Sequence, residues 1–128
     1  MPARRLAAFV LAALLAGPAF ADGFTRIDDK RAFLETIGGR ELRLPLFRIR
    51  LIVAPDGSIE GSALGWPVKG RWNWKDGFFC REMDWSGTPV PFNCQLVEVR
   101  GDRALRFTTD RGAGDSAEFK LREIAASM

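Results

Sequence analysis

The sequence predicts a mainly β domain, an antiparallel meander that forms a small barrel or a strongly curved sheet. From Glu41 onward, apolar residues recur at every second position, and glycine-containing turns separate the short apolar segments. Helical segments do not alternate with the strands, so a parallel nucleotide-binding sheet is not expected. One short N-terminal helix and one disulfide complete the predicted architecture.

The first 21 residues have the pattern of a cleaved secretory signal. Arg4 and Arg5 precede an apolar run over residues 6–16, and the small-x-small triplet Ala19-Phe20-Ala21 marks a cleavage position. The run is about half the length that a bilayer span requires. We therefore expect residues 22–128 to form a single β-rich domain in the periplasm or the extracellular space, with no membrane span after cleavage.

Removal of this signal leaves the domain almost neutral. The full chain has 19 Lys and Arg residues against 16 Asp and Glu residues, and Arg4 and Arg5 leave with the signal. The formal charge of the remaining chain is about +1, and its basic residues are spread at strand spacing rather than clustered. We therefore expect no nucleic-acid partner.

Cys80 and Cys94 are the only cysteines, and both lie in the mature part of the chain. An exported protein meets an oxidising compartment, where cysteines form disulfides. Their wide spacing does not match the C-x-x-C redox motif, and the chain has no histidine to complete a typical zinc site. We predict a disulfide, worth about 3 kcal/mol in the chain-entropy model, and no metal site.

The N-terminal helix is predicted from its start and stop signals. Asp28 or Asp29 is expected to cap a helix that ends at Ile37, where two consecutive glycines follow. The strand pattern after this helix changes phase near Pro45, which predicts a bulge, bend or break there.

Two Asp-Gly turns set the registers expected for the next two hairpins. The first, within residues 54–58, suits a three-residue loop with a left-handed glycine. In that register Val53 faces Ile59 and Leu51 faces Gly61.

The second Asp-Gly turn, at Asp76 and Gly77, is expected to have the same form. This register places four residues on one core face, with the disulfide against the aromatic rings: Trp72, Trp74, Phe78 and Cys80. It leaves Phe79 on the opposite face with the arginines. A two-residue turn would instead pair Trp74 with Phe79 and turn Cys80 to the other side.

Three further strands complete the predicted meander. They are expected at residues 95–99, 105–109 and 117–123, with turns at 101–102 and 111–115. The helix is expected to cover an end or an open side of the resulting sheet.

The candidate ligand or partner surface combines aromatic and arginine side chains: Trp66, Phe79, Arg81 and Trp85. Exposed aromatic rings beside arginines are suited to binding a small apolar or anionic ligand, or an envelope protein. The structural alternative for the same residues is a second apolar layer under the helix or cation–π packing by the arginines.

The glycine-rich loop Asp110-Arg111-Gly112-Ala113-Gly114-Asp115 has a structural interpretation. Its spacing does not match the calcium-loop pattern D-x-D-x-D-G, and no P-loop lysine or helix follows it. We expect a hairpin loop in which Gly112 and Gly114 permit the turn and Asp110 acts as a hydrogen-bonding clasp.

Catalysis is not favoured by the residue types present. The chain contains no histidine and no tyrosine, so triads and metal sites that use histidine are not available. Two carboxylate pairs remain, Glu82 with Asp84 and Asp110 with Asp115, and both are typical of solvated surface. We assign no catalytic residue and no cofactor.

The cysteine, tryptophan and glycine pattern resembles a family of small exported bacterial proteins of unknown function. The resemblance rests on Gly70-x-Trp72-x-Trp74-x-x-Gly77-x-Phe79-Cys80-Arg81, on Asn93-Cys94-Gln95 and on Arg106-Phe107-Thr108-x-Asp110-x-Gly112-x-Gly114. Some members carry the name dihydrodipicolinate reductase, which implies a two-domain nicotinamide enzyme. The chain lacks the G-x-G-x-x-G motif and the length of such an enzyme.

Overall fold

The computed structural model describes residues 23–124, so the predicted signal lies outside the described residues. The elements, in chain order, are β1 (Thr25–Ile27), α2 (Lys30–Ile37), β2 (Arg40–Leu44), the short 3-10 helix η2 (Pro45–Phe47), β3 (Ile49–Val53), β4 (Ser58–Ala63), β5 (Trp66–Lys75), β6 (Phe78–Trp85), β7 (Thr88–Arg100), β8 (Ala104–Thr108), the short 3-10 helix η3 (Asp110–Gly112) and β9 (Ser116–Glu123).

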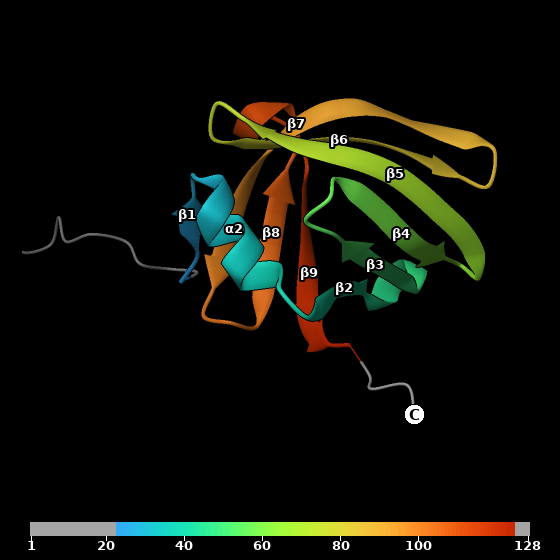
Figure 1. Ribbon diagram of the computed structural model, residues 1–128, viewed down its shortest axis with the longest axis horizontal. Coiled ribbons are helices and arrows are strands. Elements are labelled where there is room, and N and C mark those ends of the chain that lie inside the picture. Colours follow the sequence, from blue (N-terminus) through green and yellow to red (C-terminus); the bar gives the residue numbers. More distant parts are fainter. Residues whose placement is uncertain (1–22, 125–128) are drawn as a thin grey trace, which may run out of the picture.

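Strands β2 to β9 form a closed antiparallel barrel (Figure 1). Each strand pairs with the next along the chain, and β9 returns to pair with β2, where Leu42 lies opposite Leu121. The long strand β7 also pairs with β1, so that Arg26 lies opposite Glu98. This architecture confirms the predicted small barrel.

All strand pairs among residues 23–124 are antiparallel. A dinucleotide-binding domain requires parallel strands joined by crossover helices. The described fold therefore differs from the architecture that the reductase name implies.

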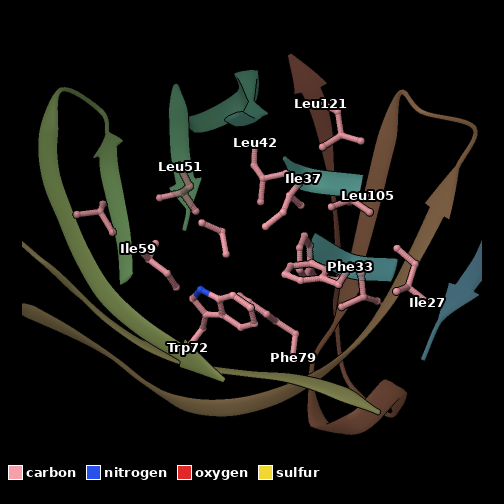
Figure 2. Packing of buried hydrophobic residues seen from close by; sticks show 14 residues of the cluster. Ile27, Phe33, Ile37, Leu42, Leu51, Ile59, Trp72, Phe79, Leu105 and Leu121 are labelled. Carbon is pink, nitrogen blue, oxygen red and sulfur yellow. The ribbon is translucent and has the colours of Figure 1, made fainter. Parts of the chain in front are cut away.

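The predicted helix is present as α2 and closes one end of the barrel. Asp29 caps it by accepting a hydrogen bond from the backbone N–H of Ala32, at 2.8 Å. Phe33 is fully buried, and its ring centre lies 5.4 Å from that of Trp72 and 5.2 Å from that of Phe79. Figure 2 shows the Phe33 side chain among these core residues, inside the ring of strands. No helix within residues 23–124 is long and apolar enough to cross a membrane.

Successive strands of the meander run in opposite directions, so its connections divide between the two ends of the barrel. The end under α2 includes the β3–β4 and β5–β6 turns. There Trp72 Nε1 donates to the carbonyl of Ala54, at 2.8 Å, and Trp74 Nε1 donates to the carbonyl of Asp28, at 3.4 Å. The opposite end, here called the open end, includes η2 and the turns at residues 64–65 and 86–87, whereas η3 lies beside the start of β6, where Arg111 contacts the Phe78 ring.

The first Asp-Gly hairpin has the predicted register. Val53 lies opposite Ile59, and Leu51 lies opposite Gly61. Gly57 has a φ of +93°, as a left-handed glycine at the end of this loop requires.

The predicted register of the second Asp-Gly hairpin is wrong. Asp76 and Gly77 have φ values of +54° and +86°, which form a two-residue turn of type I′. Trp74 therefore lies opposite Phe79, and Trp72 lies opposite Arg81. This is the alternative register, and it reverses the face of every residue in β6 relative to β5.

Phe78 and Cys80 consequently point away from the lumen of the barrel. Phe78 is partly buried between the guanidinium groups of Arg26 and Arg111, which lie 4.9 Å and 5.3 Å from its ring centre. Cys80 lies opposite Cys94 and forms the predicted disulfide with it. The bond is compatible with an oxidising, exported location, but it does not pack against Trp72 as expected.

The later strands lie close to their predicted positions. Strands β8 and β9 begin and end within one residue of the expected bounds, whereas β7 begins earlier, at Thr88. The phase change near Pro45 is the η2 turn, which ends at Arg48 in a left-handed conformation with a φ of 49°.

Glu41 forms a charged cluster on β2 and β3. Arg43 and Arg50 lie opposite each other across the strands, and like charges in that position repel. Glu41 is only 2% exposed and binds both guanidinium groups, with a distance of 3.2 Å from Arg50 Nη2 to Oε2. Burial acts to raise the pKa of Glu41, but the hydrogen bonds and charges of the two arginines outweigh it and hold the pKa below its ordinary value of 4.5.

This lowered pKa predicts a specific acid sensitivity. The stabilisation by ionised Glu41 is present above its unfolded-state pKa and is lost as the pH falls through the lower folded-state value. Urea unfolding between about pH 5 and pH 3 should show a smaller loss of stability in Glu41→Gln than in the wild type. Glu60→Gln, at an exposed position of β4, controls for the removal of one carboxylate. Equal acid dependence of Glu41→Gln and the wild type would contradict this role.

Candidate functional site: the lumen of the barrel

The lumen contains two cavities whose linings overlap. Cavity A has a volume of about 240 Å³. Its apolar lining is Leu42, Leu51, Val53, Ile59, Phe79, Met83, Phe107, Ala117 and Phe119, and its polar lining is Arg81, Gln95, Thr109, Asp115 and Ser116.

Cavity B has a volume of about 390 Å³ and no polar side chain in its lining. It is lined by Phe47, Ile49, Leu51, Ala63, Leu64, Val68, Met83, Trp85, Val90 and Phe119. Leu51, Met83 and Phe119 border both cavities, so the two are neighbouring compartments of one inner surface.

The rim of cavity B is apolar and lies at the open end. Phe47 in η2 is 49% exposed, and Leu64 in the β4–β5 turn is 47% exposed. The N–H of Leu64 donates to the carbonyl of Phe47 at 3.0 Å, which joins the two loops into one edge. An apolar molecule at this end therefore meets apolar side chains before it reaches the lumen.

Gln95 brings an unpaired amide into cavity A. It lies opposite Phe79 in the β6–β7 pair and is only 6% exposed. Its side chain has no hydrogen-bond partner among the described residues. Every side-chain polar atom of these residues that is cut off from solvent does have a partner, so the Gln95 amide is not cut off. The Gln95 amide therefore faces space that cavity A leaves open.

Arg81 brings a positive charge to the same wall. Its Nη1 donates to the carbonyl of Pro91 at 2.7 Å, and no carboxylate among residues 23–124 forms an ion pair with it. Burial lowers the pKa of Arg81 from its ordinary value, because removal from water disfavours the charged form. Asn93 lies opposite Arg81, but its side-chain amide donates to Asp110.

No family model matches this chain, and neither a curated protein nor a solved structure matches it. The functional argument therefore rests on the geometry of the lumen.

The structure separates the four residues of the predicted ligand surface. Phe79 and Arg81 lie together in the wall of cavity A, and Trp85 lines cavity B, where its Nε1 donates to the carbonyl of Ala63 at 3.0 Å. Trp66 is 62% exposed and borders neither cavity. Phe79 was expected on an exposed face, and this is wrong: it is 4% exposed because the type I′ turn directs it inward.

Gln95 was not identified as a site residue from the sequence. The alternation of Gln95, Val97 and Val99 along one strand does place this amide on an apolar face. A polar residue at a core position in a strand indicates either a buried hydrogen bond or a ligand contact.

The glycine-rich loop joins η3 to β7. The Asn93 side-chain amide donates to Asp110 Oδ1 at 2.8 Å, and the Asp110 N–H donates back to Asn93 Oδ1 at 2.9 Å. Gly112, with a φ of +99°, lies against Leu96, and the Gly114 N–H donates to the carbonyl of Thr109 at 2.9 Å. The Asp110 side chain thus acts as a clasp to β7, and its backbone carbonyl accepts a hydrogen bond from the loop N–H of Ala113 at 3.1 Å.

The carboxylates of residues 23–124 form no metal-binding cluster. No group of three or more Cys, Asp or Glu side chains in the described part of the chain could hold a metal ion. Asp84 accepts a hydrogen bond from the Gly87 N–H at 2.8 Å, which fixes the β6–β7 turn. Glu82 lies beside it in a shallow outer depression with Lys69 and Arg71.

Proposed function

We propose that this domain is an exported binding module, periplasmic or secreted, that holds a small and largely apolar molecule in its lumen. A barrel of this size either fills its interior with side chains or encloses one small ligand. Here the interior is filled by Phe33 and its neighbours under α2 and is hollow toward the open end. The observation that carries the proposal is the continuous apolar surface of cavities A and B.

The size and lining of cavity B agree with those of ligand sites in general, and cavity A adds a smaller neighbouring compartment. Such sites have volumes of about 300–1,000 Å³ and apolar walls with few polar groups. Burial of each methylene group of a ligand contributes about 0.8 kcal/mol. The predicted signal and the disulfide support an exported location for this module.

Binding of the fluorescent probe N-phenylnaphthylamine tests the proposal. The probe is uncharged, so we expect it to occupy cavity B and to become brighter there. Ala63→Phe, which fills cavity B from β4, should weaken binding about tenfold or more. Ala113→Phe, at an exposed loop position, should leave binding unchanged.

The two variants separate lumen binding from surface binding. Equal affinity of Ala63→Phe and the wild type would place the probe outside the lumen and contradict the proposal. Circular dichroism spectra of the two variants confirm that the barrel is intact in each, because overfilling a core costs stability.

A further inference from the structure

The strongest unexplained feature of the lumen is a cation without a counter-ion. Arg81 lies in the wall of cavity A with only the carbonyl of Pro91 as its hydrogen-bond acceptor among the described residues. Removing a charge from water is costly unless an opposite charge or several hydrogen bonds compensate for it. An anion in cavity A would provide this compensation.

The Gln95 amide is placed to share such an anion with Arg81. Gln95 and Arg81 are diagonal neighbours on the inward face of β6 and β7, a spacing that long side chains can span. Each has N–H donors, and a carboxylate has two acceptor oxygens. Hydrogen bonds between charged groups are about twice as strong as neutral ones.

Asp115 restricts the charge of the ligand. Its carboxylate borders cavity A but is exposed to solvent at the edge. A second negative charge on the ligand would be repelled there, so a monoanion fits better than a dianion. The polar end of the lumen thus favours a single carboxylate.

The rest of the lumen suits an apolar tail. Met83 follows Arg81 on the same strand and borders both cavities, so the charged wall lies next to the entirely apolar cavity B. We propose that the ligand is an amphiphile with one carboxylate head, bound by Arg81 and Gln95, and an apolar tail that lies in cavity B. This inference rests on the proposed function of the lumen.

Calorimetric titration of the oxidised protein with decanoate, decanol, decylammonium and decyl phosphate tests the head group. Decanoate should bind the wild type about tenfold or more tightly than decanol, and more tightly than decyl phosphate or decylammonium. Arg81→Met should abolish this preference while it leaves decanol binding within about twofold. Arg103→Met, which removes one exposed positive charge at the β7–β8 turn, should retain the preference.

Gln95→Met provides a second and independent measurement. Replacing the Gln95 amide, which has no hydrogen-bond partner in the largely apolar lumen, by an apolar side chain of similar size should raise the melting temperature of the free protein. The same variant should bind decanoate more weakly. A gain in stability together with a loss of decanoate affinity distinguishes a ligand-binding amide from a structural one.

The outcomes separate this inference from the proposed function. Equal binding of decanoate and decanol to the wild type, or equal losses of both in Arg81→Met, would overturn the carboxylate head and leave lumen binding intact. Tighter binding of decyl phosphate would overturn the choice of a carboxylate. Failure of all four compounds and of N-phenylnaphthylamine to bind would overturn both.

Discussion

Replacing Gly61 by alanine will destabilise the barrel by about 3 kcal/mol or more. Gly61 in β4 lies opposite Leu51 in β3. A Cβ atom at Gly61 would overlap the carbonyl oxygen of Arg50 and would lie 2.8 Å from its carbonyl carbon and 3.0 Å from the Cα of Leu51. These are backbone atoms of a paired strand, so they cannot move aside without disturbing the β3–β4 pairing.

Gly101→Ala is the matched control for this change. Gly101 lies in the β7–β8 turn with a φ of +58° and no atom within 4 Å of a Cβ built there. Its replacement should cost only the left-handed conformation, about 1 kcal/mol. Urea unfolding of both variants measures the difference, and a similar loss in the two would show that β3 and β4 do not approach as closely as described.

Phe33→Ala will remove about 3–5 kcal/mol of stability, the usual cost of deleting a buried phenylalanine. Phe33 is fully buried and contacts the rings of Trp72, Trp74 and Phe79. The change leaves a void between α2 and the barrel. Water should then reach Trp72, so the tryptophan emission of the folded variant should move to longer wavelength.

Leu34→Ala is the matched control on the same helix, because alanine favours a helix at either position and only the amount of lost packing differs. Leu34 lies on the same helix but is only partly buried. We expect a smaller loss of stability and an unchanged emission maximum. If Leu34→Ala lowered the free energy of unfolding as much as Phe33→Ala, the packing of the Phe33 ring would not be the main contact that holds α2 on the barrel.

Turn chemistry explains why one hairpin register was predictable and the other was not. Both hairpins contain an Asp-Gly pair, but Pro55 precedes the pair in the first and Lys75 in the second. Proline fixes a negative φ and favours a type I turn followed by a left-handed glycine. Without it, Asp76 adopts a positive φ, and the type I′ turn matches the twist of the strands.

The candidate site was predictable only in part because β6 has apolar residues on both faces. Phe78 and Phe79 are adjacent, so alternation alone does not reveal which one enters the core. Arg81 and Trp85 were identified by residue type, yet their place in the lumen depends on the turn that precedes them. The β2–β9 pairing that encloses the cavities joins distant segments and leaves no local signal in the sequence.

The seam between β2 and β9 also determines when this protein can fold. Every other pair of neighbouring strands in the barrel is consecutive along the chain, whereas residues 40–43 can pair only after residues 120–123 have been synthesised. Until then the sheet has two unpaired edges, which are prone to aggregation. The ribosome therefore synthesises almost the whole described domain before the barrel can close, so folding is completed after synthesis. A truncation that removes β9 leaves an open sheet.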